Sequence, residues 1–100
     1  MPYYTYILYS KSLDRFYKGS THDIFDRIQR HNHGREKATK YGVPWVLLWK
    51  TEKPDRSEAQ KLEYKLKNLS RERLCKFMMK YREGVAGPDE LLLIEQLSGC

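Results

Sequence analysis

Short runs of apolar and aromatic residues alternate along this chain with longer segments of helical periodicity. Residues 3–9 are dense in β-forming side chains, a polar turn containing Asp14 follows, and residues 15–19 resume the strand character. The apolar run 45–49, which begins directly after Pro44, has the length of a buried strand. These runs predict a β-hairpin and a third strand of the same sheet.

The segment after the predicted hairpin carries the signals of a helix. Thr21 or Asp23 can cap its first turn, and helical periodicity then continues to Asn32. Gly34 lies just past the last periodic residue, where a glycine commonly ends a helix. The pattern therefore predicts a first helix that ends near Asn32, followed by a loop up to Pro44.

Two further helices are predicted after the third strand. Asp55 and Glu58 have the spacing of a capping box and begin a helix that runs to about Asn68. Ser70 can cap a third helix, which later glycines end. The last stretch, residues 89–97, can form a short acidic helix that packs its leucines against the rest of the chain.

Together these elements predict an α+β protein with a small three-stranded antiparallel sheet flanked by about three helices. One hundred residues leave room for one modest core. We expect one domain over residues 1–82 and an acidic, leucine-containing C-terminal tail over residues 83–100. Cys75 and Cys100 are the only cysteines, and two cysteines cannot build a disulfide framework or a zinc site.

The location of the protein can be predicted from what the chain lacks. No apolar run approaches the roughly 20 residues that cross a bilayer. Residues 1–10 have neither the charged start nor the small-residue cleavage site of a signal peptide. We therefore expect a soluble cytoplasmic protein that does not bind a membrane.

The net charge of +6 is unevenly distributed. All 19 lysines and arginines lie at or before Arg82, together with nine acidic residues, so the body carries +10 and the remaining residues carry −4. A surface that basic attracts polyanions through their phosphates, independently of sequence. The expected partner is DNA, with RNA as an open alternative. Basic residues on helices can equally be ordinary solvated faces, and charge alone does not decide between these interpretations.

Five residues have the chemistry of a phosphodiester-cutting site, which needs a base for water, a cation for the developing charge and a metal ligand. Tyr6 and Tyr17 lie eleven residues apart on the two hairpin strands. A phenol titrates near 10 and becomes a useful base only beside a metal-bound water or a cation. The alternative is that both are ordinary strand tyrosines.

The remaining three candidates lie on the predicted helices. Arg27 can hold two phosphate oxygens at once, and His31, one turn later, can orient the phosphate or carry a proton. The alternatives are an exposed helix arginine and a helix-end histidine. Glu63 borders an apolar stripe, where a structural helix rarely places a charge, whereas Glu58 serves as a cap. One carboxylate suits a single Mg²⁺ or Mn²⁺ that keeps most of its waters.

These residues occur in an order that resembles the GIY-YIG endonuclease superfamily, specifically its small stand-alone bacterial members, similar to an excision-nuclease subunit. The matching pieces are Tyr4-Thr5-Tyr6, Tyr17-Lys18-Gly19, Arg27 with His31-Asn32, Gly34, and Glu58-Ala59 leading to Glu63. The resemblance covers about residues 3–69. Two positions depart from the usual pattern: Tyr4 replaces a glycine, and Lys18 replaces an apolar residue.

The resemblance implies a role for each of the five residues. Tyr6 is carried over as general base or water activator, and Tyr17 as its hydrogen-bonded partner. Arg27 is carried over as phosphate stabiliser and His31 as an auxiliary group. Glu63 is carried over as the ligand of one divalent metal ion, Mg²⁺ or Mn²⁺.

The expected substrate is structured, damaged or single-stranded DNA. The side chains predicted to grip it are Lys18, Lys37, Lys40, Arg71 and Arg73, with base stacking on Tyr41 or Trp45. One rival hypothesis is a non-catalytic module that binds nucleic acid and recruits a partner nuclease. Another is an interaction domain whose C-terminal tail forms a homodimer or binds a partner protein.

Overall fold

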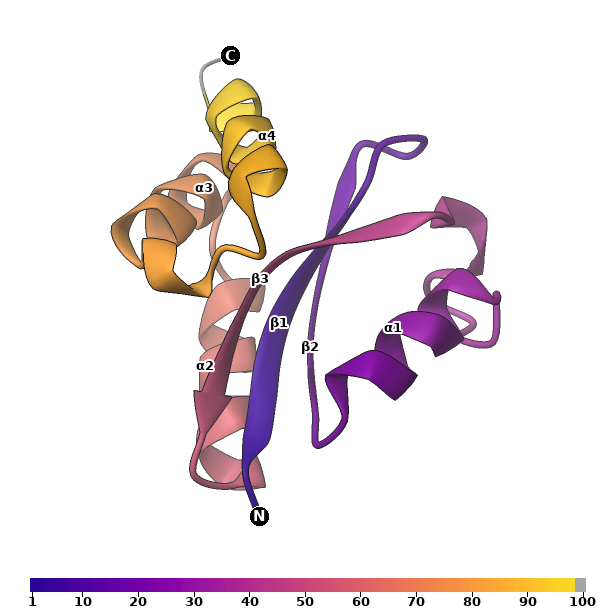
Figure 1. Cartoon of the computed structure of the whole chain (residues 1–100), viewed down its shortest axis with the longest axis vertical. Helices are drawn as coiled ribbons and strands as arrows, with labels where there is room; N and C mark the ends of the chain where they lie inside the picture. The colour runs from indigo at the N-terminus through magenta and orange to yellow at the C-terminus, as the bar shows by residue number, and fades with distance from the viewer. Residues whose placement is uncertain (99–100) are drawn as a thin grey trace.

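The computed structural model describes residues 1–98, which form one three-stranded sheet and four α-helices (Figure 1). The elements are, in order, β1 (Tyr3–Ser10), β2 (Arg15–Thr21), α1 (Ile24–Asn32), β3 (Trp45–Lys53), α2 (Arg56–Lys67), α3 (Arg71–Lys80) and α4 (Pro88–Ser98), with short 3-10 turns at Lys40–Gly42 and Arg82–Gly84. The predicted α+β class is confirmed.

The sheet has the strand order β2-β1-β3, and both pairings are antiparallel, as predicted. Asp14 turns the chain between β1 and β2 with a φ of 52°, a left-handed conformation that aspartate adopts more readily than most residues. Its carboxylate accepts a hydrogen bond of 2.6 Å from the Tyr9 hydroxyl. The Tyr9 side chain of β1 therefore stabilises the turn that follows this strand.

Side-chain caps begin the first three helices. Asp23, rather than Thr21, caps α1, because its carboxylate accepts from a backbone N–H of the first turn, while the Thr21 hydroxyl accepts from the N–H of Asp23. Asp55 and Ser70 cap α2 and α3 as predicted. Gly34 follows α1 with a φ of +71°, the conformation that explains a glycine at that position.

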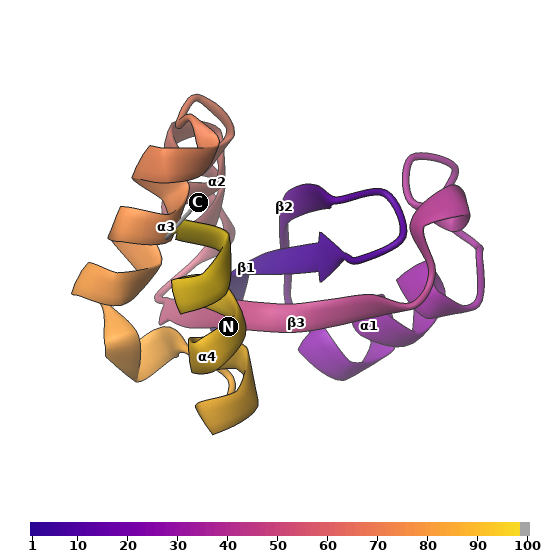
Figure 2. The ribbon, with the colours of Figure 1, turned by 90° about the horizontal axis from the view of Figure 1, so that it is seen from above.

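The central strand β1 supplies both halves of the core. Because side chains alternate along a strand, Tyr6 and Leu8 pack with Trp45 on the side of α1. Ile7 and Tyr9 pack on the other side, in a larger cluster with residues of β3, α2, α3 and α4. Figure 2 shows α1 well separated from the group formed by α2, α3 and α4.

Residues 83–98 pack against this larger cluster. The backbone N–H of Ala86 donates to the carbonyl of Leu48 at 2.9 Å, and Val85 bridges to Trp49 on the edge of β3. Ile94 of α4 is fully buried. A boundary at residue 82 stays a prediction. Within residues 1–98 no helix combines the length and apolar character that spanning a membrane requires.

Candidate active site

A chain of hydrogen bonds joins Tyr6 of β1 to His31 of α1 and to Thr39 in the loop after α1. The Tyr6 hydroxyl lies 3.0 Å from His31 Nε2, and His31 Nδ1 lies 2.7 Å from Thr39 Oγ1. All three side chains are buried. The Thr39 hydroxyl donates to the carbonyl of Glu36, so its oxygen accepts from His31 Nδ1–H. His31 Nε2 is then the acceptor for the Tyr6 hydroxyl.

Gly19 allows the ring of Tyr6 to lie against β2. Tyr6 pairs with Gly19 and Leu8 with Tyr17, so both tyrosines share the sheet face toward α1. The Tyr17 ring centroid lies 6.3 Å from that of Tyr6 and 4.9 Å from that of His31. A Cβ at Gly19 would lie 2.6 Å from the Tyr6 hydroxyl oxygen, so any side chain there would displace the ring. The hydroxyl of Tyr6 bonds to His31, whereas the resemblance implied a bond to Tyr17.

Arg27 lies on α1 four residues before His31, as the spacing predicted. It is within electrostatic range of Tyr6, Tyr17 and His31. Its Nε atom is buried and has no hydrogen-bond partner among residues 1–98. A buried, unpaired N–H of a guanidinium is costly, and an anion would satisfy it. The Nε–H of Arg27 could therefore donate to an anionic oxygen.

Glu63 of α2 approaches the site from the other face of the sheet. Its Oε1 accepts a hydrogen bond of 2.6 Å from the Ser20 hydroxyl of β2, and its Oε2 lies 2.7 Å from Lys67 Nζ. The side chain of Glu63 is 20% exposed and so remains open to solvent. Because Ser20 directly follows Gly19, the carboxylate and the Tyr6 ring meet β2 at neighbouring residues, from its two faces.

Burial sets the protonation state of the site. It raises the pKa of the Tyr6 phenol, to which Tyr17 adds, while Arg27 opposes the increase. Burial also raises the pKa of Tyr17, and the charge of Lys67 opposes this. Burial lowers the pKa of His31. At neutral pH the protein therefore holds neutral phenols beside a neutral imidazole, a donor and an acceptor ready for proton transfer.

Glu63 is the residue of the site that fits a divalent metal ion. No cluster of three or more His, Cys, Asp or Glu side chains occurs within residues 1–98. A single carboxylate that is partly exposed and oriented by Ser20 fits Mg²⁺ or Mn²⁺, because Mg²⁺ commonly keeps several waters and takes one or two carboxylates. The metal ion would therefore be held by one protein ligand and by water.

The side chains predicted to bind nucleic acid lie on separate parts of the surface. Lys37, Lys40 and Tyr41 belong to the loop after α1 and are exposed, with Tyr41 77% exposed and Lys40 Nζ 5.0 Å from its ring centroid. Lys18 of β2 is half-buried, and burial, together with the charge of Lys67, lowers its pKa. Arg73 is exposed in the first turn of α3.

Two other side chains predicted to contact nucleic acid are engaged within the protein. Arg71 holds both carboxylate oxygens of Asp14, each at 2.9 Å, and lies over the ring of Phe16. Trp45 is buried, and its indole N–H donates to the carbonyl of Thr39 at 2.7 Å. The prediction of base stacking on Trp45 is therefore wrong, because the ring belongs to the core.

Three residues of the site were not predicted. Lys67 follows Glu63 by four residues on one helix, a spacing that signals an ion pair and could have revealed it. Thr39 and Ser20 carry no comparable signal. Only the fold brings Thr39 to His31, and Ser20 to a carboxylate 43 residues away.

The sequence profile of the GIY-YIG catalytic domain matches residues 2–82, and the chain belongs to this family. GIY-YIG domains are nuclease domains, which hydrolyse phosphodiester bonds of nucleic acids and typically use a divalent metal ion. The resemblance inferred from the ordered motifs is confirmed. The match ends at residue 82, so α4 lies beyond it.

Within the family the chain is similar to small stand-alone proteins. It is 35% identical to the UPF0213 protein of Staphylococcus haemolyticus over 77 residues, which cover 76% of this chain and 93% of that protein. The UPF0213 protein of Staphylococcus saprophyticus is 36% identical with the same coverage. The solution NMR structure of the UPF0213 protein from Bacillus halodurans is 35% identical, with a TM-score of 0.51 over 90% of this chain and 92% of that one.

Proposed function

We propose that this protein is a metal-dependent endonuclease that hydrolyses phosphodiester bonds in structured, damaged or single-stranded DNA. The observation that carries the proposal is the buried Nε of Arg27, which has no hydrogen-bond partner among the described residues and belongs to a side chain within electrostatic range of Tyr6 and its hydrogen bond to His31. An anion-binding atom beside a phenol that can pass on its proton suits attack by water on a phosphodiester. RNA is the second substrate that the same chemistry accepts.

In the proposed reaction a water molecule attacks phosphorus and gives its proton to the Tyr6 oxygen, while Tyr6 passes its own proton to His31 Nε2. The bond to the leaving oxygen breaks, and that oxygen takes a proton from solvent. Arg27 stabilises the charge on the non-bridging oxygens. Tyr17 packs against the Tyr6 and His31 rings and fixes their geometry. Glu63 is the residue that would hold a divalent ion, and such an ion would supply further positive charge to the reaction.

The loop after α1 is the proposed contact for the nucleic acid next to the cut. Lys37 and Lys40 flank Thr39, whose side chain orients His31, so a strand bound by these lysines passes close to the site. The exposed ring of Tyr41 offers a stacking surface to an unpaired base. Such contacts recognise backbone and unstacked bases rather than a base sequence, which supports a substrate defined by its structure.

A non-catalytic module that binds nucleic acid and recruits a partner is the second candidate. The observation that favours it is the ion pair of Lys67 with Glu63, which engages the one carboxylate suited to a metal ion. Leu92 of α4 is exposed and would serve a partner protein or a second copy of the chain. For either function we infer that the protein acts in the cytoplasm, where DNA is accessible.

The deciding experiment measures Mg²⁺- and Mn²⁺-dependent nicking of duplex, flap, branched and single-stranded DNA at low salt. The variants are Arg27→Ala and Glu63→Gln. The matched controls are Arg30→Ala, which removes an exposed arginine of the same helix, and Glu58→Gln, which removes an exposed carboxylate of α2. We expect Arg27→Ala to cut about 10²–10³ times more slowly, the usual cost of losing one transition-state donor.

Glu63→Gln should lose metal-dependent cutting, while both control variants cut like the wild type. Both site variants should still bind the DNA, because the basic loop after α1 is unchanged. DNA binding by the wild type without cutting on any substrate would instead favour the recruitment module. Equal cutting by Arg27→Ala and Arg30→Ala would contradict the assigned role of Arg27.

A further inference from the structure

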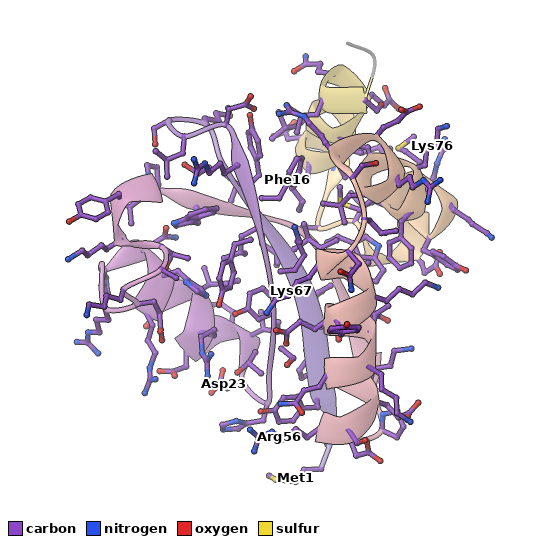
Figure 3. The ribbon with its side chains drawn as sticks, turned by 180° about the vertical axis from the view of Figure 1, so that it is seen from behind. Met1, Phe16, Asp23, Arg56, Lys67 and Lys76 are labelled. Atoms are coloured by element: carbon purple, nitrogen blue, oxygen red, sulfur yellow. The ribbon has the colours of Figure 1, made fainter. Side chains whose placement is uncertain are left out.

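Lys67 closes the side of the site that faces α2. Its ammonium lies 2.7 Å from Glu63 Oε2, while Oε1 of the same carboxylate accepts from Ser20. Both oxygens of the proposed metal ligand are thus engaged by neighbours. In Figure 3, which views the molecule from behind, the Lys67 side chain lies beside the sheet, between α2 and the helix that begins after Asp23.

The charge of Lys67 acts on the site beyond Glu63. It lies within electrostatic range of the Tyr17 phenol, whose ring packs against His31. It also lies within range of the ammonium of Lys18 on β2. Lys18 and Lys67 are two cations on this side of β2, and Glu63 is the carboxylate between β2 and α2. The three side chains together therefore carry an excess of positive charge. The Nε of Arg27 supplies positive charge from the α1 side.

We propose that Lys67 is a substrate-binding residue of the nuclease site: its ammonium pairs with Glu63 until a divalent cation takes that carboxylate, and it then binds an oxygen of the scissile phosphate. This inference rests on the proposed function, because it requires a metal ion on Glu63 and a phosphate at Arg27. It assigns Lys67 two successive partners.

The physical properties of the side chain fit this exchange. A lysine carries a compact charge on a flexible four-carbon stem and can exchange one oxygen partner for another. The Lys67 side chain is 52% exposed, so no packed core holds it in place. A divalent cation competes directly with an ammonium for one carboxylate, and the displaced ammonium is repelled by the cation. In the proposed reaction, the anion that becomes available to the displaced ammonium of Lys67 is the scissile phosphate of the substrate.

The alternative is an ordinary helix ion pair, and α2 itself provides the comparison. Lys61 lies 3.0 Å from Glu58 on the same helix, also as a local lysine–carboxylate pair. Both side chains of that pair are more exposed than those of Lys67 and Glu63. Lys61→Met therefore removes the same charge and a similar ion pair without touching the site.

The first measurement is the affinity of the protein for Mn²⁺ in the absence of DNA. It is determined by isothermal titration calorimetry or from the electron paramagnetic resonance signal of free Mn²⁺. We expect Lys67→Met to bind Mn²⁺ about 3- to 10-fold more tightly than the wild type, because a competing cation has been removed. Lys61→Met should bind it like the wild type. Glu63→Gln reports whether the ion sits on Glu63.

The second measurement is nicking at saturating Mn²⁺. Lys67→Met should cut at least about 10-fold more slowly, because a phosphate contact is lost. Lys67→Arg should recover part of the rate, since it keeps the charge, and Lys61→Met should cut like the wild type. Tighter metal binding combined with slower cutting is a pair of opposite effects that loss of structural support does not produce.

Each outcome has a defined meaning. If the wild type binds Mn²⁺ through Glu63 and cuts DNA, but Lys67→Met binds the ion no more tightly or cuts at the wild-type rate, the inference is overturned and the nuclease stands. If Lys67→Met loses both metal affinity and thermal stability, Lys67 is a structural residue and the inference is overturned. If the wild type neither binds Mn²⁺ through Glu63 nor cuts, the proposed function fails and the inference fails with it.

Discussion

At the scale of single residues, the hydrogen bond between Tyr6 and His31 makes the proposed reaction sensitive to pH. Only a neutral His31 can accept the Tyr6 proton, and burial lowers the pKa of His31 below its usual value of about 6.5. We predict a nicking rate that is flat from about pH 6.5 to 8 and falls at lower pH, as His31 becomes charged. The measurement is the single-turnover rate of nicking as a function of pH.

The variants His31→Gln and Thr39→Val test the origin of this acid limb. His31→Gln should be slow at every pH and lack the limb. Thr39→Val keeps the shape of the side chain and removes the acceptor of His31 Nδ1–H, so it should slow nicking without altering binding of DNA. A wild-type midpoint above pH 7 would contradict the assignment, because burial moves the pKa of His31 downward.

The same lowered pKa has a consequence for stability. Between the pKa of His31 in the folded protein and about 6.5, the unfolded chain binds more protons than the folded chain. The contribution of His31 to stability is therefore complete above about pH 6.5 and is lost as the pH falls through the folded pKa. His31→Gln should reduce this part of the pH dependence of unfolding.

Much of the candidate site could be predicted because its residues follow local rules. Arg27 and His31 share a face of α1 because they are four residues apart. Tyr6 and Tyr17 share a face of the hairpin because Tyr6 pairs with Gly19, which lies two residues from Tyr17 on the same strand, and side chains two residues apart point to the same face. The contacts made by Thr39 could not be predicted, because they depend on the path of an irregular loop around His31.

At the scale of elements, all three strands were predicted from the sequence, but the predicted third strand was shorter than the observed one. The apolar run ends at Trp49, whereas β3 continues to Lys53 through polar residues. These residues pair with the start of β1, so the backbone ladder rather than apolar burial extends the strand. A pattern of apolar residues cannot predict backbone hydrogen bonding between strands where the side chains are largely exposed to solvent. The sequence predicted that α4 packs its leucines against the rest of the chain, but not that Ile94 is its fully buried residue, since leucines lie around much of the helix.

Helix α4 supplies a prediction at this scale. Ile94 is fully buried in the cluster that includes Ile7 of β1, although the family match stops at residue 82. We expect Ile94→Ala to lower the free energy of unfolding by about 2–5 kcal/mol, the usual cost of truncating a buried Ile to Ala. The measurement is chemical denaturation of the full chain.

The control for this prediction lies two residues earlier. Leu92 is 57% exposed, so Leu92→Ala should change the free energy of unfolding by no more than about 0.5 kcal/mol. Equal effects of the two substitutions would contradict the packing of α4 on the common core. A stable Ile94→Ala variant would favour a tail that is independent of the domain over residues 1–82.

At the scale of the whole molecule, the excess of basic residues up to Arg82 predicts that the protein binds nucleic acid. The structure shows that some of these side chains are exposed in loops, whereas others already pair with a carboxylate of the protein. Lys40 is exposed in the loop beside Thr39, with Tyr41 as its neighbour. Arg71 is also on the surface, but both oxygens of Asp14 already hold its guanidinium. Both residues contribute equally to the net charge, but we expect only Lys40 to contribute to phosphate binding.

Salt dependence separates these two kinds of cation. For duplex DNA the logarithm of the binding constant should fall linearly with the logarithm of salt concentration, and each lost phosphate contact should reduce the slope by about 0.9. We predict this reduction for Lys40→Gln and an unchanged slope for Arg71→Gln, measured by fluorescence anisotropy in a Glu63→Gln background that does not cut. Arg71→Gln should instead destabilise the hairpin that Asp14 turns, because it leaves that carboxylate without its cation. Equal slopes for wild type and Lys40→Gln would remove the loop after α1 from the binding surface and leave the basic charge as a solvated face.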